Sequence, residues 1–542
     1  MAIDDARDAI AEQTTGEDDD GSASTLVAVA ATAVALLVVS PLTWLFLRGG
    51  SIPPERALSL LTSDTTIRVT INTFGLVGVV TVASVLLGVP LAYLTVQTDL
   101  PFPRFFTITS ALPLVVPSYL GAFAFVSAFG PRGVLAGLLA PVGIEQIPSL
   151  YGFPGAVLVM TLYTYPYIFL TTRATLLSMD GTVVEAARSL NHTRWEAFKR
   201  VTLPRLLPGI AAGALLVALY TLSDFGTPTI MRLDVYTRMI YNEFGRRSLD
   251  AASLLSLLLL VMAFAILALE SRIGADREGA YVSRGRRRPG TVRLGRWKWP
   301  AVAFASLVAV LALVVPVGIL LLWLVREGPG YAAGGMPFHL ATAWHSVSLS
   351  AAAAIICVLA GLPIAYLASR SSGLAGSLPE RFSYVGYATP GVVIGLALVY
   401  LGLLYVPFLY KSVVLLVFAY VVRFLPQAIG TTKSSLLQVD PRYIEAARSL
   451  GYAPLTAFRK VVLPLVVPAL AAGGALVFLT AMKELPATLM LRPFGFETFV
   501  TYIWEVREQG YYGQAAIPAL VLLAVSGLSM LVILGRERFD GT

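Results

Sequence analysis

The sequence predicts an all-α protein that crosses a membrane about twelve times, as two parallel repeats of six helices. Of its 542 residues, 56% are hydrophobic and only 13% are charged, whereas soluble domains have about 25% charged residues. The mean hydropathy is +0.75. Twelve apolar stretches have the length of about 20 residues that a helix needs to cross a bilayer. One charged segment occurs twice, which indicates a duplicated chain.

The chain starts with an acidic segment, residues 1–24, that holds eight acidic residues and one arginine. This composition predicts a disordered tail. The apolar run that follows lacks the basic start and short core of a signal peptide, so we expect it to remain as the first span. The twelve expected spans are residues 26–47, 69–96, 107–129, 154–178, 205–224, 250–271, 300–325, 346–369, 383–405, 411–433, 464–483 and 514–535.

Basic residues predict the direction of these spans. The gap between the sixth and seventh spans holds nine basic residues and two acidic ones, and cytoplasmic loops are rich in Lys and Arg. Counting spans from this gap places the loops 180–204 and 434–463 in the cytoplasm, together with both termini. The loop 225–249 is external by this count although it carries four arginines. Because the basic residues lie in short gaps between apolar runs, the net charge of +8 is read as membrane anchoring, and no nucleic-acid partner is expected.

The repeated segment is EAARSLNHTRWEAFKRVTLPRLLPGI, residues 185–210, which returns as EAARSLGYAPLTAFRKVVLPLVVPAL, residues 445–470. Over residues 185–219, 18 of 35 positions are identical at a spacing of 260 residues. Chance similarity of Ala- and Leu-rich helices would not repeat the charged residues and prolines. Six spans per half give both halves the same orientation. The expected domains are 25–272 and 299–536, with a basic linker at 273–298 and a short tail at 537–542.

Each copy of this segment predicts a helix, a turn and a second helix. Gly451 suits a left-handed cap at the end of the first helix, and Asn191 is the next most tolerant residue at that position. The second helix is predicted from the capping-box spacing of Thr193 and Glu196 and from Pro454, which suits a first helical position. The prolines that follow, Pro204 and Pro464 with Pro208 and Pro468, are expected to stop the amphipathic segment and to open the next span.

The surface of this loop combines small, apolar and charged residues. Small alanines allow another surface to approach closely, and the expected apolar knob is formed by Leu190 and Phe198, or by Leu450 and Phe458. The simpler alternative is an amphipathic helix bound to lipid headgroups. Two copies with the same cap position and the same terminal proline favour a docking surface.

The repeated pattern resembles the cytoplasmic loop of permease subunits of ATP-binding-cassette (ABC) importers. The second copy fits the family pattern throughout, and the first departs from it at Asn191, where Gly is usual. The resemblance implies the type I ABC importer permease fold in a prokaryotic cell membrane, two ATPase subunits on the loops and an extracytoplasmic solute-binding protein. It also implies a coupling role for Glu185, Ala186, Ala187, Leu190, Asn191, Phe198, Pro204, Glu445, Ala446, Ala447, Leu450, Gly451, Phe458 and Pro464.

The stretches that follow each loop, LSDFGTPTIMRLDVYTRMIY and MKELPATLMLRPFGFETFVTYIW, look like the corresponding parts of fused ferric-iron permeases. Fused thiamine permeases, or permeases for another small solute, are the nearest alternative. A gradient-driven secondary transporter would share the duplication but has no reason to carry two docking loops. A membrane enzyme would need a cluster of Asp, His or Cys that the sequence does not show.

Charged residues near the predicted pathway complete the candidate sites. Asp224 and Glu484 are equivalent at a spacing of 260 residues, each at the end of the fifth span of its half, and Lys483 precedes Glu484. They are candidates for the pathway or its gate, although residues at helix ends often only face headgroups. Arg423 lies within a span, either buried or reaching towards the membrane surface. No metal site and no cofactor are expected, and ATP hydrolysis is expected in a separate protein because the chain lacks a phosphate-binding loop.

Overall fold

The computed structural model describes residues 2–130, 133–143, 149–179, 193, 196, 198–275, 291–326, 338–370 and 373–536. Eleven helices in this part of the chain are long and apolar enough to cross a membrane, or twelve if one bent pair counts as a single span. The predicted all-α fold and the approximate number of spans are therefore confirmed. The tail predicted to be disordered appears as the start of α1 (Ala2–Gly50); because its side chains lie outside the described residues, its disorder stays a prediction.

The first half continues after α1 with four long helices and several short ones. The long helices are α3 (Asp64–Gln97), α7 (Phe153–Ser178), α10 (Leu203–Ser223) and α13 (Leu249–Ala275). The short helices are α2 (Pro54–Leu61), α4 (Pro103–Ala111), α5 (Ser118–Phe129), α6 (Val134–Leu139), α11 (Gly226–Ile230) and α12 (Tyr236–Gly245).

The second half repeats this order. It begins with α14 (Lys298–Ala309) and α15 (Val315–Val325), which a π-helical turn joins into one span. The helices α16 (Leu340–Arg370), α17 (Leu374–Ala388), α18 (Gly391–Leu404), α19 (Val413–Leu436), α20 (Pro441–Ser449), α21 (Pro454–Ala457), α22 (Leu463–Ala481), α23 (Pro486–Leu491), α24 (Phe499–Glu508) and α25 (Ala516–Arg536) follow.

Two spans that we expected to be continuous are broken at equivalent places. The expected span 107–129 divides into α4, a short turn at Leu112–Val115, and α5. The expected span 383–405 divides into α17 and α18, which are bent by 102°. Pro117 and Pro390 immediately precede the second helix of each pair. Proline lacks an N–H and pushes the preceding residue towards an extended backbone, so a helix cannot pass through unchanged.

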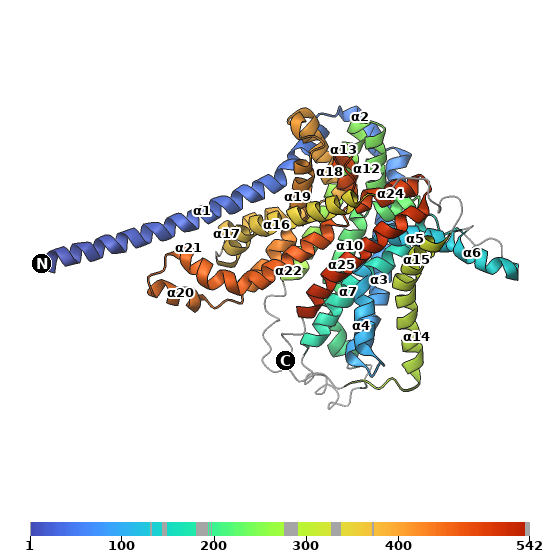
Figure 1. Ribbon diagram of the computed structural model, residues 1–542, viewed down its shortest axis with the longest axis horizontal. Helices are drawn as coiled ribbons and strands as arrows, with labels where there is room; N and C mark the ends of the chain where they lie inside the picture. Colours follow the sequence, from blue (N-terminus) through green and yellow to red (C-terminus); the bar gives the residue numbers. More distant parts are fainter. Residues whose placement is uncertain are drawn as a thin grey trace.

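The first helix of each half packs on the other half of the chain. Helix α1 lies against α16, α17 and α18, whereas α14 contacts α4, and α15 contacts α5. In Figure 1 the yellow-green α14 and α15 stand beside the blue and cyan helices of the first half. The predicted domains are therefore consecutive in sequence but interlocked in space.

Helices α20 and α21 lie at one end of the molecule, and α12 and α24 gather at the other (Figure 1). Helices α10 and α22 hold equivalent places in the order of helices, each directly after a copy of the repeated segment. This arrangement gives the molecule a protruding loop at one end and, as described below, a cavity between the halves.

Candidate functional site

The loop between α19 and α22 has the cap geometry that its sequence predicts. Gly451 has a φ of +84°, and its N–H donates to the carbonyl of Arg448 at 2.9 Å. The N–H of Tyr452 donates to the carbonyl of Ala447 at 3.2 Å. These two bonds form a Schellman cap, in which the left-handed residue is usually glycine. Helix α21 starts at Pro454, as predicted.

The equivalent loop of the first half is only partly described. Glu185, Ala186, Ala187, Leu190 and Asn191 lie outside the described residues. The capping box is nevertheless confirmed. The Thr193 N–H donates to a carboxylate oxygen of Glu196 at 2.9 Å, and the Glu196 N–H donates to the Thr193 hydroxyl at 3.3 Å.

The side chains expected to form one apolar knob have two different environments in the second loop. Leu450 is 79% exposed, whereas the Phe458 ring packs edge-on against Tyr366, with 5.2 Å between ring centroids. Phe198 makes the same contact with Tyr93 in the first half, at 5.5 Å. The two phenylalanines therefore attach the loops to α16 and α3, and Leu450 is left to face outward.

The predicted coupling residues of α20 differ in their exposure to solvent. Glu445 and Ala446 are exposed, while Ala447 is buried. Only one of the two alanines is thus accessible for the close approach of another surface. Of the residues predicted to couple, Glu445, Ala446, Leu450 and Gly451 are exposed in this loop, and we call the surface formed by Glu445, Ala446 and Leu450 the docking face.

The prolines expected to stop the amphipathic segments do not interrupt the helix. Pro204 and Pro464 are the second residues of α10 and α22, directly after π-helical turns at Phe198–Thr202 and Phe458–Val462. A π-helical turn changes the hydrogen-bond register from i→i−4 to i→i−5, and such turns occur where a continuous helix accommodates an irregularity such as a residue without an N–H. Each loop therefore continues without a break into a membrane helix.

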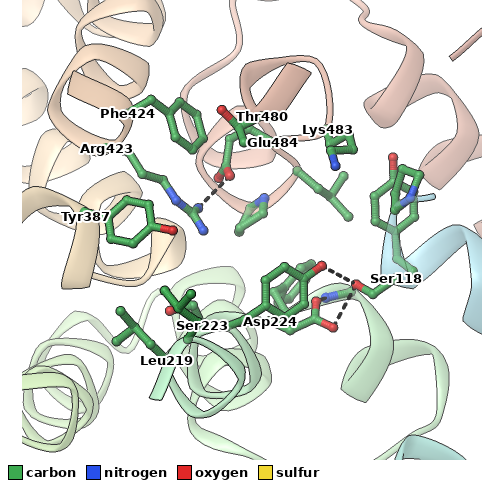
Figure 2. Close-up of a pocket in the computed structure, with 18 of the residues that line it drawn as sticks. Ser118, Leu219, Ser223, Asp224, Tyr387, Arg423, Phe424, Thr480, Lys483 and Glu484 are labelled. Carbon is green, nitrogen blue, oxygen red and sulfur yellow. Dashed lines mark hydrogen bonds and ion pairs between the residues drawn. The ribbon is translucent and has the colours of Figure 1, made fainter. Parts of the chain in front are cut away.

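A central cavity of about 160 Å³ lies between the two halves. Figure 2 shows Glu484 and Lys483 on one wall and Asp224 with Ser118 on the facing wall, and Arg423 reaches in from the side. The structure thus brings together Asp224, Lys483 and Glu484, the three pathway candidates. The other lining residues are Pro117, Tyr119, Tyr167, Leu216, Leu219, Tyr220, Ser223, Phe225, Gly226, Tyr387, Phe424, Gln427, Thr480, Leu485 and Pro486.

The two equivalent carboxylates are held in different ways. Asp224 accepts hydrogen bonds from the Ser118 hydroxyl at 2.9 Å and from the Gly226 N–H at 3.0 Å. Glu484, which is 5% exposed, forms an ion pair with Arg423 at 2.5 Å. A buried charge is tolerated when it is paired and hydrogen-bonded. The negative charge of Glu484 is therefore compensated, whereas that of Asp224 is stabilised by neutral donors.

Arg423 is accordingly buried in the protein and does not reach towards the membrane surface. Its side chain is 18% exposed, and the break before α18 makes room for it. A Cβ atom on Gly391, the first residue of α18, would lie 1.8 Å from Arg423 Nη1 and 2.5 Å from Glu484 Oε1. Glycine at this position is thus required by the close approach of the ion pair.

Lys483 links the two halves across the cavity. Its Nζ donates to the carbonyl of Leu114 at 2.8 Å, within the turn that separates α4 from α5. A carbonyl becomes available here because the regular helix is interrupted. The interrupted helix of the first half therefore binds the ammonium group of Lys483, which belongs to the second half.

Sequence reasoning missed the residues at the helix breaks. Ser118 and Gly391 are equivalent at a spacing of 273 residues, each directly after a proline. Interrupted apolar segments at corresponding positions in two repeats are a known indicator of a binding site in transporters. The aligned prolines were the signal that could have located the cavity.

Comparison with known proteins places this geometry in a family. The model of the family "binding-protein-dependent transport system inner membrane component" matches residues 84–328 and 358–536, more than half of the chain. The chain belongs to this family. It is a fused permease of the ABC importer type, because the family domain occurs twice, and a multi-pass membrane protein of the type I ABC permease fold.

Individual relatives of the permease differ in their cargo. An Fe(3+)-transport system permease protein of Haemophilus influenzae is 28% identical over 92% of this chain and 96% of its own length. A ferric transport system permease protein of Actinobacillus pleuropneumoniae is 26% identical over 89% of this chain and 73% of its own length. The thiamine transport system permease of Escherichia coli is 24% identical over 80% of this chain and 81% of its own length.

Proposed function

We propose that this permease imports ferric iron into the cytoplasm, driven by two separate ATPase subunits and supplied by an extracytoplasmic solute-binding protein. The observation that carries this proposal is the docking face of α20, where Leu450 projects from a loop that Phe458 anchors to the same half. An exposed leucine on a rigid, capped loop suits insertion into a groove of a partner.

The loops would transmit movement from the ATPases to the membrane helices. Because each loop continues through a π-helical turn into α10 or α22, displacement of a loop moves the end of the helix that precedes Asp224 or Glu484. The two halves would rock so that the central cavity opens alternately to each side. The Lys483–Leu114 contact joins the halves and is the contact we expect to break when they separate.

Ferric iron is favoured as cargo because the Asp224 carboxylate lines the cavity and has no ionic partner among the described residues, and carboxylate oxygens suit hard metal cations. The similarity to ferric permeases over most of the chain supports the same cargo. Thiamine is the second candidate. Its positive charge and ring system would suit the aromatic walls formed by Tyr119, Tyr167, Tyr220 and Phe424.

The topology belongs to the same proposal. Both termini and both coupling loops would lie in the cytoplasm, so that the end of the molecule holding α12 and α24 faces outward. The first-half residues Glu185, Ala186, Ala187, Leu190 and Asn191 would form the second docking face.

Reconstitution tests the proposal directly. The permease, its ATPase and its binding protein are placed in proteoliposomes, and uptake of ferric iron and of thiamine is measured with and without ATP. ATP-dependent uptake of iron alone is expected. Uptake without the ATPase subunit would instead favour a gradient-driven transporter, and uptake of thiamine alone would transfer the proposal to the second candidate. A Glu445→Lys variant should insert normally but fail to co-purify with the ATPase.

A further inference from the structure

A second cavity, of about 830 Å³, lies near the end of the molecule that holds α24. We call it the basic vestibule. It is lined by Arg232, Arg326 and Arg507 but by a single acidic residue, Glu508. Helix α5 borders both cavities, since Tyr119 lines the central cavity and Phe123 lines the vestibule. These two residues are one helical turn apart, about 6 Å along the helix axis.

Two of the arginines are positioned by aromatic rings. The Arg232 guanidinium lies 4.6 Å from the ring centroid of Tyr151, and that of Arg507 lies 5.2 Å from Trp504. Stacking of this kind fixes the plane of a guanidinium and leaves its N–H groups at the edge free to bind a ligand. Among the described residues, neither Arg232 nor Arg507 takes part in an ion pair.

The backbone at Arg232 is set by the end of α11. Its φ is +57° because Arg232 is the left-handed residue of a Schellman cap: its N–H donates to the carbonyl of Thr229 at 3.2 Å, and the Leu233 N–H donates to the carbonyl of Pro228 at 2.8 Å. Burial lowers the pKa of Arg507 from its ordinary value; the neighbouring carboxylate of Glu508 opposes this shift, and the positive charge of Arg232 makes a smaller contribution in the same direction as burial. The two guanidinium groups therefore repel one another across the vestibule.

The duplicated positions show that this arrangement occurs at only one of the two equivalent places in the described halves. At a spacing of 260 residues, Arg232 corresponds to Arg492, which is neutralised by Glu505 at 3.1 Å. Arg507 corresponds to Arg247, which is exposed. The fold thus contains these arginine positions twice. Arg232 and Arg507 line the vestibule, whereas their equivalents Arg492 and Arg247 do not.

From this geometry we infer that the basic vestibule binds a small multivalent oxyanion, a di- or tricarboxylate or a phosphate. Planar guanidinium groups bind carboxylate and phosphate through paired hydrogen bonds. The cavity volume lies within the usual range for small-molecule sites, about 300–1,000 Å³, and it exceeds the size of a single inorganic ion. Bound anion would relieve the repulsion between Arg232 and Arg507.

The position suggests a role in transport, which rests on the proposed function. A bare multivalent cation that enters the vestibule would be repelled by its three arginines. An oxyanion bound there would neutralise them, so that the cation passes as part of a complex with lower net charge. The vestibule would then be the first binding site for a metal cation that arrives in complex with an oxyanion.

Binding is tested with the full-length permease in lipid nanodiscs at low ionic strength, with isothermal titration of citrate and of inorganic phosphate. Saturable binding of at least one is expected. Arg232→Gln and Arg507→Gln should each weaken binding at least tenfold, and Arg507→Lys should weaken it less because it keeps the charge. The matched control Arg247→Gln should leave binding within twofold, and folding of each variant is checked by size-exclusion chromatography.

Three results would overturn the inference. These are the absence of saturable binding to the wild-type chain, equal affinity in the Arg507→Gln variant, or failure to bind either anion while the same variants weaken association with the solute-binding protein. The last would assign the arginines to a protein surface. Because binding is measured without the ATPase, a permease that binds citrate but does not import iron would refute the proposed cargo and leave the vestibule site intact.

Discussion

The ion pair of Arg423 and Glu484 gives the sharpest test of the central cavity. Replacing Glu484 with Gln leaves the guanidinium without its partner, 2.5 Å from an uncharged amide. Removing one member of a buried pair destabilises proteins by about 3–5 kcal/mol, because the remaining charge is uncompensated. Arg423 keeps 18% of its side-chain exposure at the cavity, so we expect a loss near the lower end, about 3 kcal/mol.

The equivalent carboxylate provides a matched control. Asp224 accepts its hydrogen bonds from Ser118 and Gly226 and has no ionic partner among the described residues. Asp224→Asn leaves no buried charge unpaired and keeps an oxygen that can accept, so a loss of about 1 kcal/mol is expected, the value of one hydrogen bond. The pair of variants thus compares two symmetry-related sites that differ in electrostatics.

The assay is reversible unfolding of the purified permease in mixed micelles, in a double-mutant cycle. Glu484→Gln and Arg423→Gln should each destabilise the protein, and the double variant should recover most of the loss, since neither charge is left alone. Equal losses for Asp224→Asn and Glu484→Gln, or strictly additive losses in the double variant, would refute the conclusion that this pair is electrostatically coupled.

Three further predictions concern the helix breaks and the loop. Gly391→Ala should displace the Arg423 ion pair, because the new Cβ would lie 1.8 Å from Nη1; we expect it to lower the unfolding free energy more than Ser118→Ala, which removes one hydrogen bond worth about 1 kcal/mol. Gly451→Val should strain the loop by about 1–2 kcal/mol, since φ is +84° although the space around it is open, and reduced co-purification of the ATPase with normal membrane insertion is the expected readout. Leu450→Ala should weaken ATPase binding without changing thermal stability, whereas Phe458→Ala should lower stability by about 1 kcal/mol through loss of the aromatic contact; a stability loss for Leu450→Ala would contradict its assignment to the docking face.

The sequence by itself determined the features that depend on local chemistry. Span length and hydropathy predicted the all-α membrane fold and the approximate number of spans, and the repeat predicted the duplicated family domain. The residues that cap helices can also be recognised locally, because they contact backbone atoms only a few residues away. These residues are Gly451, Pro454, and the pair of Thr193 and Glu196. Their predicted geometry was found in each case.

Only the tertiary structure decided which helices meet. Apolar side chains that face lipid and those that face another helix are chemically alike, so hydropathy could not show that α1 packs on the second half and α15 on the first. It also could not show where Arg423 points, because a charge in a span can either reach the surface or find a partner. Glu484 is 61 residues away along the chain. Pro390 marks the helix break beside the pair, but only the packing of distant segments brings Arg423 and Glu484 together at that break.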